Sequence, residues 1–362
     1  MIPFAQFMEL ALYCPDCGYY EKEKDIGKHG DFITSVSVGK LFAQLLAFQF
    51  SEWLEPEIAR DATIRIVEAG AHNGALARDI LEWLSEHRAP LFDRVCYSIL
   101  EPSLPRRARQ KEALIEFGDR ISWHAGLQDL ATAAGGAMQG VIFSNELLDA
   151  MPVHRIAWDK RSRNWFEWGV AEENGNLVWR RMDLALPTVE IPKAAAELRD
   201  ILPDGYVVEM SPAARRWWRE AAAILQRGRL MTIDYGATDG SPRAERATGT
   251  LRAYSHHAVS TDLLAAPGEQ DITAHIDFEM IRNAGEEQGL GTETLVSQEK
   301  FLTLIAARAW KPDSEFGEWT SAMGRQFQTL THPDHFGRAF HVLVQSRGDR
   351  GSALLARLDS QV

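Results

Sequence analysis

Short apolar runs alternate with amphipathic stretches through the first half of the chain. Thr63–Gly70 and Arg94–Pro102 are apolar and contain β-branched residues, which is typical of buried parallel strands. Between them, apolar positions from Leu76 to Leu84 recur every four residues and predict a helix. Ile121–Trp123 and Gly140–Ser144 predict two further strands. Strands that alternate with helices predict an α/β fold with a doubly wound, Rossmann-like parallel sheet.

The pattern changes after Pro152, where aromatic residues alternate with polar ones around an Asn174-Gly175 turn signal. Such a stretch predicts antiparallel β-hairpins inserted into the fold. The core pattern then resumes with a helix at Pro212–Arg227 and a strand at Arg229–Tyr235. A late apolar run, AFHVLVQ, predicts the last strand.

These patterns predict four parts in a chain of 362 residues. Residues 1–60 are expected to form an N-terminal helical cover, and 61–152 the first part of a nucleotide-binding core. Residues 153–210 are expected to form the inserted β-hairpin region. The remainder of the core is expected in 211–362, where 249–278 lines a cleft.

The chain is acidic and carries a formal net charge of −12. Because binding to phosphates requires excess Lys and Arg, this charge argues against extended nucleic-acid binding, and it is compatible with a cationic substrate. No apolar stretch reaches the ~20 residues of a membrane span, and the N-terminus lacks the basic start of a secretory signal. The three cysteines, Cys14, Cys17 and Cys96, indicate a reducing compartment, so we expect a cytoplasmic protein.

A glycine-containing turn, Gly70-Ala71-His72-Asn73-Gly74, follows the first strand. Glycines let the chain turn sharply and let a ligand approach the backbone, while the next helix offers free N–H groups. The turn therefore suits a nucleotide or nucleoside, although an ordinary strand–helix turn has the same pattern. It is not the GxGxxG dinucleotide fingerprint, because His72 and Asn73 occupy its middle.

An acidic residue, Glu101, ends the second strand. A carboxylate at this position can accept hydrogen bonds from both ribose hydroxyls of a nucleoside. The alternative is a solvated strand-end carboxylate or a neighbour of a helix N-cap. NAD and S-adenosylmethionine both contain ribose, so the turn and the acid predict nucleoside binding without separating the two cofactors.

Several further motifs are spread along nearly the whole chain. With the turn and the acid they are Gly18-Tyr19-Tyr20, Gly30-Asp31-Phe32-Ile33-Thr34-Ser35, Glu68–Gly74, Glu101-Pro102-Ser103, Asn145–Val153, Ile233-Asp234-Tyr235-Gly236 and Pro267–Phe278. Together they resemble the MidA-like methyltransferases, a family that includes the mitochondrial complex I assembly arginine methyltransferases. The resemblance implies a Rossmann-like methyltransferase sheet, S-adenosyl-L-methionine as cofactor and a protein arginine as methyl acceptor.

The resemblance also implies a set of cofactor-binding residues. These are Glu68, Gly70, His72, Asn73, Gly74, Glu101, Pro102, Ser103, Asn145 and Thr34. His72 departs from the family pattern, which usually has a third glycine there, against which the methionine part of the cofactor lies. We expect the His72 side chain to point away or to bond the methionine carboxylate, which the Asn73 amide can also do.

Two acidic residues, Glu146 and Asp149, follow the fourth strand at the edge of the sheet where ligands bind in such folds. Arginine stays protonated at neutral pH, and paired carboxylates can hold its fork of donors and localise its charge. One helical turn would place these two acids on neighbouring faces, so we expect them to be the catalytic residues. The alternative is a helix N-terminus whose acids interact with the helix dipole.

Two other segments have two interpretations each. Asp31, Thr34 and Ser35 either fold over the cofactor or cap a helix that begins near Val38. An alternating run is expected to lie on one face of a strand, which we interpret as a cleft wall and not as a metal site: Asp271, Thr273, His275 and Asp277.

The remaining candidates are weaker. His256-His257 lacks a clear metal-ligand spacing, and the pair Cys14 and Cys17 lacks the second pair of a zinc knuckle, so neither a metal nor a redox site is expected. Four tryptophans are expected to pack the inserted hairpins or to frame a protein-binding groove: Trp158, Trp165, Trp168 and Trp179.

The leading functional prediction is an S-adenosylmethionine-dependent methyltransferase that acts on a protein, with arginine as the nucleophile. A small-molecule methyltransferase, a nicotinamide-dependent oxidoreductase and a non-catalytic assembly factor that binds the cofactor are the alternatives. The sequence does not indicate an oligomeric state.

Overall fold

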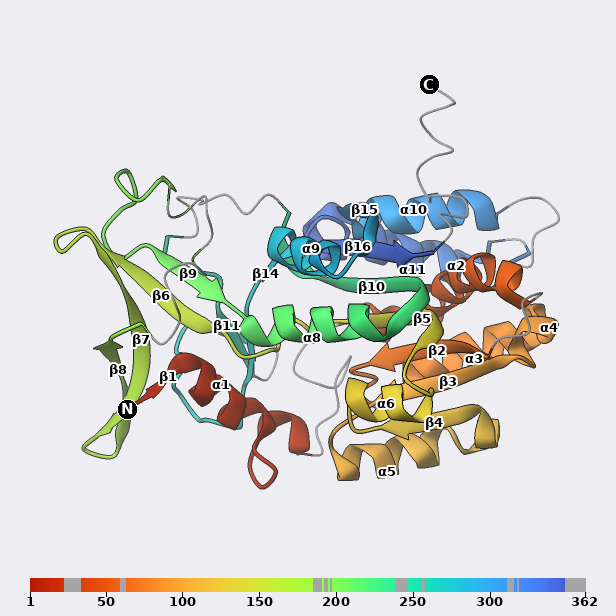
Figure 1. Cartoon of the computed structure of the whole chain (residues 1–362), viewed down its shortest axis with the longest axis horizontal. Helices are drawn as coiled ribbons and strands as arrows, with labels where there is room; N and C mark the ends of the chain where they lie inside the picture. Colours follow the sequence, from red (N-terminus) through yellow and green to blue (C-terminus); the bar gives the residue numbers. More distant parts are fainter. Residues whose placement is uncertain are drawn as a thin grey trace. The chain divides into compact units, whose positions relative to one another are not determined.

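The computed structural model describes residues 1–22, 34–58, 63–184, 191, 195, 197–238, 247–255, 258–310, 316–317 and 319–348. The chain divides into two compact units, each assembled from three stretches of sequence (Figure 1). Unit 1 comprises Met1–Phe32, Leu148–Trp217 and Tyr235–Ile281. Unit 2 comprises Ile33–Leu147, Trp218–Asp234 and Arg282–Val362.

Unit 2 is built on a mostly parallel sheet with the strand order β15-β16-β10-β5-β2-β3-β4. The pairs β10–β5, β5–β2, β2–β3 and β3–β4 are parallel, whereas β15 and β16 pair antiparallel. This sheet confirms the predicted α/β fold class. Its strands are β2 (Ile64–Ala69), β3 (Val95–Leu100), β4 (Ile121–His124), β5 (Met138–Asn145), β10 (Leu225–Ala237), β15 (Gly291–Ser297) and β16 (Phe340–Arg347).

The order of the strands reverses between β2 and β5. From β2 the chain proceeds outward to β3 and β4, and from β5 it proceeds the other way to β10. Ala69 lies opposite Ser144, so the carboxyl ends of β2 and β5 are nearly level, and Asn145 lies opposite Ile233 of β10, which continues to Ala237. In open α/β sheets, ligands bind beside the carboxyl ends of the strands at such a reversal.

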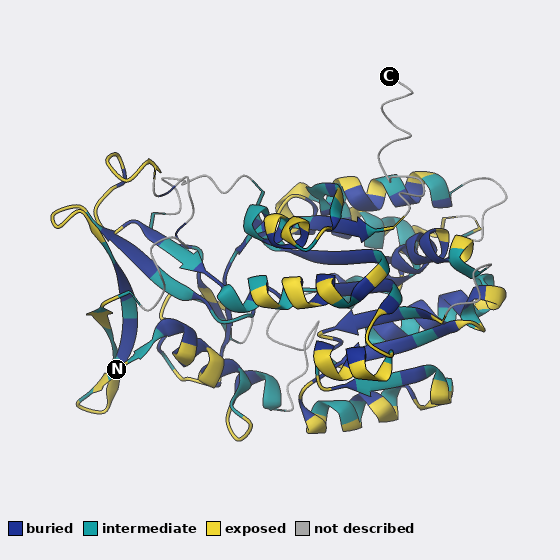
Figure 2. Ribbon diagram, in the orientation of Figure 1, coloured by how far each residue is buried: buried dark blue, intermediate teal, exposed yellow. Residues whose placement is uncertain are grey.

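Helices cover the sheet of unit 2, and their outward faces are exposed while the strands are largely buried (Figure 2). Helix α2 packs against α3, α10 and α11, which explains why apolar residues occur on most sides of it. The helical elements are η2 (Val36–Val38), α2 (Leu41–Ile58), α3 (Ala75–His87), α4 (Ala89–Phe92), α5 (Leu104–Ala113), η3 (Ile115–Arg120), α6 (Leu127–Ala133), α10 (Gln298–Ala309), α11 (Ser321–Thr331) and η6 (Pro333–Gly337). Helices α8 (Pro212–Ile224) and α9 (Phe278–Glu287) each contribute residues to both units.

Unit 1 contains the predicted hairpins. Strands β6, β7 and β8 pair antiparallel, and the β7–β8 turn has left-handed backbone at Asn174 (φ 54°) and Gly175 (φ 79°), as its sequence predicts. The strand order is β1-β7-β6-β9, and β12-β11-β13 form a second, smaller sheet. The elements are β1 (Ile2–Pro3), α1 (Phe4–Tyr13), η1 (Tyr19–Glu21), β6 (His154–Asp159), β7 (Asn164–Glu173), β8 (Asn176–Met182), β9 (Val207–Met210), β11 (Arg252–Ser255), β12 (Ala258–Ser260), β13 (Asp271–Thr273) and β14 (Ile276–Asp277).

The core of unit 1 joins the N-terminal helix to both small sheets. Phe4, Met8 and Leu12 of α1 form one buried cluster with Val170 of β7 and Ile272 of β13. These three residues of α1 are spaced by four, so one face of the helix supplies them all. The hydrophobic effect thus fixes the N-terminal segment against strands that are distant in the sequence.

Some sequence expectations differ from the structure. The helix expected at Pro212–Arg227 ends at Ile224, because β10 begins at the next residue. The strand expected to carry Asp271 through Asp277 on one face is interrupted at positions 274 and 275, so those residues do not form a single face. His256-His257 and Asp31 lie outside the described residues. None of the described helices is both long and apolar enough to cross a membrane.

Candidate functional site

The turn after β2 requires its glycines. Gly70 (φ 78°) and Gly74 (φ 81°) have left-handed backbone, which glycine adopts without strain. A Cβ atom on Gly70 would lie 3.1 Å from Leu147 Cδ1, and one on Gly74 would lie 3.0 Å from Leu114 Cδ1. His72 is also left-handed, with φ 46°. Left-handed backbone is strained for residues other than glycine, which explains why the related family usually has glycine at this position.

Asn73 closes the turn. Its side-chain Oδ1 accepts a hydrogen bond of 3.0 Å from the N–H of Ala75, the first residue of α3. The N–H of Gly74 donates to the Ala71 carbonyl over 2.7 Å. The Asn73 amide therefore has a local structural role, and contact with the methionine carboxylate stays a prediction.

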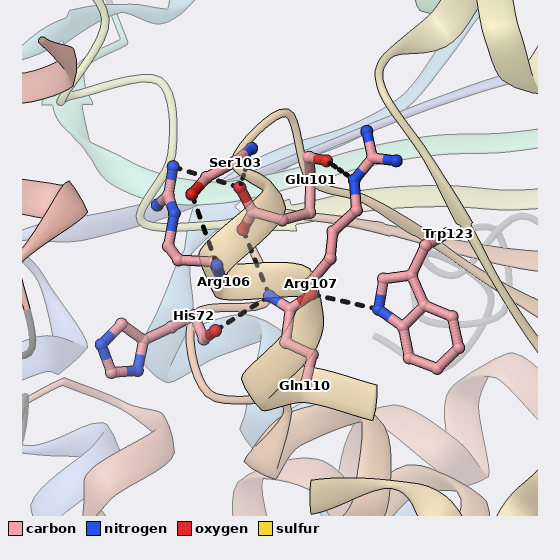
Figure 3. Close-up of polar contacts among 7 residues, drawn as sticks. All are labelled: His72, Glu101, Ser103, Arg106, Arg107, Gln110 and Trp123. Carbon is pink, nitrogen blue, oxygen red and sulfur yellow. Dashed lines mark hydrogen bonds and ion pairs between the residues drawn. The ribbon is translucent and has the colours of Figure 1, made fainter. Parts of the chain in front are cut away.

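Glu101 is buried directly after β3, with 1% of its surface exposed. Its Oε1 accepts hydrogen bonds from the Ser103 N–H (3.0 Å) and the Arg106 guanidinium (3.1 Å) (Figure 3). The interpretation of Glu101 as a solvated strand-end carboxylate is therefore wrong. The N-cap interpretation applies to its neighbour, because Ser103 Oγ accepts from the Arg106 N–H and begins α5.

Gln110 of α5 connects the glycine turn to Glu101. Its Nε2 donates to the main-chain carbonyl of His72 over 2.9 Å and to Glu101 Oε2 over 3.2 Å, while its Oε1 accepts from Trp123 Nε1 over 3.1 Å. The His72 ring points away from this cluster (Figure 3). Arg106 and Gln110 were not predicted from the sequence. Their spacing of four on the helix that Ser103 begins is the signal that would have indicated a shared face.

A second group of residues lies where β5 ends. Glu146 Oε1 accepts hydrogen bonds from the Ser35 N–H over 3.1 Å and from Asn145 Nδ2 over 2.9 Å. Thr34 Oγ1 accepts a hydrogen bond from the Ser37 N–H over 3.2 Å, while the N-cap residue of the short helix η2 is Ser35, whose side chain makes no capping hydrogen bond. The segment that contains Thr34 and Ser35 therefore leads into a short helix and contacts Glu146.

The helical turn expected to join Glu146 and Asp149 is absent. Glu146 is left-handed, with φ 53°, and its N–H donates to the Ile233 carbonyl over 3.0 Å. The next N–H, of Leu147, donates to Asp234 Oδ2 over 3.3 Å. Residues 146–151 form bends and turns and no helix, so the helix-dipole alternative is wrong as well. The division of the chain also assigns Glu146 to unit 2 and Asp149 to unit 1.

Asp149 is buried in unit 1, where tyrosines and a second acid surround its segment. Tyr20 donates a hydrogen bond of 2.7 Å to the buried Asp271, and Tyr13 donates one of 2.9 Å to the Ala150 carbonyl. Burial, with the negative charges of Asp271 and Asp149, raises the pKa of Tyr20 well above its usual value. Burial and the same two charges also raise the pKa of Tyr254. The environment of Asp149 is therefore electronegative.

Glu68 lies inside unit 2 on β2 and is 3% exposed. Its Oε2 accepts a hydrogen bond of 2.7 Å from the Tyr97 hydroxyl. Burial raises the pKa of Glu68 to about 7, and the hydrogen bond only partly offsets this effect. Glu68, two residues before the glycine turn, is thus held by Tyr97 of β3, and its pKa of about 7 lies near neutral pH.

The residues around the turn fit a nucleoside cofactor. A loop with left-handed backbone at Gly70 and Gly74, where a Cβ atom would lie only 3.0–3.1 Å from a leucine side chain, precedes α3, and Glu101 is a buried carboxylate at the neighbouring strand end. The carboxylate suits the hydroxyls of a ribose, and the glycine turn lets a cofactor approach the backbone closely. Among the described residues, no group of three His, Cys, Asp or Glu side chains is placed to hold a metal ion.

Residues 45–296 match a family model of S-adenosyl-L-methionine-dependent methyltransferases. The chain belongs to this family. Its cofactor is S-adenosyl-L-methionine, which decides between the two ribose-containing cofactors left open by the sequence. The chain is similar to a protein from Burkholderia thailandensis whose crystal structure is bound to S-adenosyl-homocysteine, at 32% identity and a TM-score of 0.83 over 98% of this chain and 90% of that chain.

Curated relatives extend this similarity to eukaryotes. The mitochondrial protein arginine methyltransferase NDUFAF7 homolog of Drosophila melanogaster is 25% identical over 99% of this chain and 83% of its own length. The mitochondrial NDUFAF7 proteins of Rattus norvegicus and Homo sapiens are 26% and 28% identical, over 94% and 83% of this chain and 80% and 69% of their own lengths. These relatives are named as mitochondrial, which contradicts the cytoplasmic location expected from the cysteine content.

Proposed function

We propose that this methyltransferase transfers a methyl group to an arginine side chain of a protein. The observation that carries the proposal is that two buried acids, Asp149 and Asp271, lie near Tyr20, which donates a hydrogen bond of 2.7 Å to Asp271. A guanidinium stays protonated at neutral pH and is stabilised by carboxylates and aromatic rings. The names of the curated relatives support the same acceptor.

On the cofactor side, we propose that Glu101 accepts the ribose hydroxyls. Its carboxylate has about four lone-pair positions, and Ser103, Arg106 and Gln110 already donate to it. The ribose must therefore share these positions or replace a donor. Arg106 is the donor we expect to move, because its long side chain reorients more easily than the main chain of Ser103.

The bound cofactor supplies a methyl group on a sulfonium, and the protein must orient the nucleophile in line with it. We propose that Glu146 and Asp149 each orient the acceptor or take its proton, since Glu146 directly follows β5 and Asp149 comes three residues later in the chain. Ser35 and Asn145 hold the Glu146 carboxylate through hydrogen bonds to Oε1. A fixed carboxylate costs less reorganisation when charge changes during the reaction.

The test is to supply the purified chain with methyl-labelled S-adenosyl-L-methionine and a cell lysate, followed by acid hydrolysis and amino-acid analysis. We expect labelled methylarginine in the protein fraction. Label on oxygen, or only in a small metabolite, would exclude arginine and leave the methyltransferase assignment intact. No transfer by a chain that binds the cofactor would favour the non-catalytic assembly factor.

A further inference from the structure

Two cysteines meet in a tight turn after α1. Cys14 follows the last residue of the helix, and its carbonyl accepts hydrogen bonds from the N–H groups of Cys17 (3.2 Å) and Gly18 (2.7 Å). The Cys17 thiol donates to Cys14 Sγ, with 3.1 Å between the sulfur atoms. A turn closed by an i to i+3 hydrogen bond brings its end Cα atoms within about 7 Å, which is near the range that a disulfide spans.

The turn is held in this shape by its neighbours. A Cβ atom on Gly18 would lie 2.6 Å from the Cys14 nitrogen, so a side chain does not fit at that position. A Cβ atom on Gly268 would lie 2.2 Å from the Cys17 carbonyl oxygen, so the loop that contains Gly268 lies directly against the turn. Lys22 and Glu269 form an ion pair beside it. Backbone packing therefore holds the turn that carries the two thiols.

The two thiols differ in acidity. The hydrogen bond from Cys17, assisted by the N–H groups of Asp16 and Cys17, lowers the pKa of Cys14. The same thiol hydrogen bond raises the pKa of Cys17. Cys17 is exposed and Cys14 is half-buried. Because the thiolate is the reactive form, Cys14 has the character of the attacking thiol and Cys17 that of the resolving thiol.

The motif alone predicts no redox site, but the sulfur separation of 3.1 Å changes that interpretation. We propose that Cys14 and Cys17 form a reversible dithiol–disulfide pair that low-molecular-weight disulfides such as glutathione disulfide oxidise. The Cys14 thiolate attacks one sulfur of the small disulfide, forms a mixed disulfide and releases one thiolate. Cys17 then loses its proton to solvent and attacks the Cys14 sulfur, which releases the second thiolate. Two protein thiols are oxidised to one disulfide, and one small disulfide is reduced to two thiols.

In the sequence, the two cysteines lie between two tyrosines that contact the segment around Asp149. Tyr13 immediately precedes Cys14 and donates a hydrogen bond to the Ala150 carbonyl. Tyr20 follows the turn and donates a hydrogen bond to Asp271. The Tyr13 and Tyr20 rings stack, with centroids 5.4 Å apart. A disulfide shortens the sulfur separation to about 2.05 Å, so the turn between these tyrosines must tighten. The site is independent of the arginine proposal, because its chemistry requires neither cofactor nor acceptor.

The two cysteines can be followed by mass spectrometry of a single peptide. Trypsin releases Met1–Lys22, which contains Cys14 and Cys17, whereas Cys96 is released in the separate peptide Val95–Arg106. The folded full-length protein is incubated with glutathione disulfide, alkylated and digested. We expect Met1–Lys22 to lose two hydrogens and to take up no alkyl group. Reduced glutathione in excess should restore two alkylated cysteines.

Matched variants separate a dithiol pair from two independent thiols. C17S is expected to accumulate a stable mixed disulfide on Cys14, because the resolving thiol is missing, whereas C96S should behave as the unchanged protein. Thermal unfolding and cofactor binding of each variant check that it is folded. The proposal is overturned if the unchanged protein keeps two free thiols at Met1–Lys22 while Cys14 of C17S reacts. It is also overturned if both cysteines stop at mixed disulfides.

Discussion

Gln110 donates a hydrogen bond of 2.9 Å to the main-chain carbonyl of His72, a residue 38 positions earlier in the chain. The same amide donates to Glu101. One buried side chain on α5 thus fixes both the glycine turn and the expected ribose acceptor relative to each other. Such positioning allows a ligand to bind without first ordering the loop.

Replacement of Gln110 should therefore weaken cofactor binding, even if Gln110 itself does not touch the cofactor. For Gln110→Met, which keeps the volume but removes the donors, we expect an affinity for S-adenosyl-L-methionine about tenfold lower, equivalent to one buried hydrogen bond of about 1–1.5 kcal/mol. Calorimetric titration measures it. Gln128→Met, at an exposed position on α6, is the control. Equal affinities of the two variants would contradict the positioning role.

Glu101→Gln tests the ribose acceptor. The change keeps the size of the side chain but removes the charge that strengthens its hydrogen bonds, so we expect cofactor affinity to fall by roughly 10- to 100-fold, or about 1.5–3 kcal/mol. The variant also loses the ion pair to Arg106, so its unfolding without cofactor must be measured. Glu112→Gln changes an exposed acid on the same helix and is the matched control. An unchanged dissociation constant for Glu101→Gln would remove this residue from the cofactor site.

His72→Gly separates backbone strain from cofactor contact. A left-handed residue other than glycine costs about 1–2 kcal/mol of folding free energy, and replacement by glycine relieves this strain. Glycine in turn lowers stability by about 0.5–1 kcal/mol, because its unfolded chain has more conformational freedom. We therefore expect thermal stability to be unchanged or slightly higher. If the imidazole contacts the methionine end of the cofactor, affinity falls. Equal or tighter binding by His72→Gly would show that the side chain is only tolerated.

Glu68 should make stability depend on pH. Its pKa is raised from 4.5 to about 7 in the folded protein, so the folded state binds the proton more tightly than the unfolded state. The resulting stability is fully present below pH 4.5 and is lost as the pH rises through about 7, by about 3 kcal/mol in total. Urea unfolding at pH 5 and pH 8 measures the free energy of unfolding of the unchanged protein and of Glu68→Gln. Identical pH dependence in both proteins would refute the assignment.

Glu146→Gln and Asp149→Asn address the chemical step. Each removes one charge that we expect to act on the acceptor during transfer, so turnover should fall by about 10²–10³. Cofactor affinity should stay nearly unchanged, because the amide oxygen that replaces Glu146 Oε1 can still accept from Ser35 and Asn145. The comparison of single-turnover rates with calorimetric affinities distinguishes the two effects. A variant with full turnover would exclude its residue from catalysis.

The sequence predicted the sheet better than the site. Apolar runs located β2, β3 and β5 within a few residues, because parallel strands buried on both faces have few polar positions. The same logic failed after Asn145, where the chain forms bends and turns instead of a helix, and a buried acid on β10, Asp234, accepts the Leu147 N–H. Local patterns do not contain such a long-range partner.

The site residues show the same limit. Glu101 was predicted from its place after a strand, yet the neutral amide of Gln110 on the next helix was not, because a single polar residue on an amphipathic helix resembles a solvated one. Its complete burial appears only when α5 packs beside the glycine turn. Likewise, the distance between Cys14 and Cys17 sulfur atoms depends on the turn and not on the motif alone.

The position of β16 between β15 and β10 has a consequence for biosynthesis. Translation proceeds from the N-terminus, so the ribosome completes β10 at position 237 more than 100 residues before it reaches the first residue of β16, Phe340. Until then the β10 edge is open and β15 lacks its partner. Open strand edges recruit other strands, so the nascent chain is exposed to misassembly during this interval. Chaperone protection of the elongating chain would be most valuable between those two points.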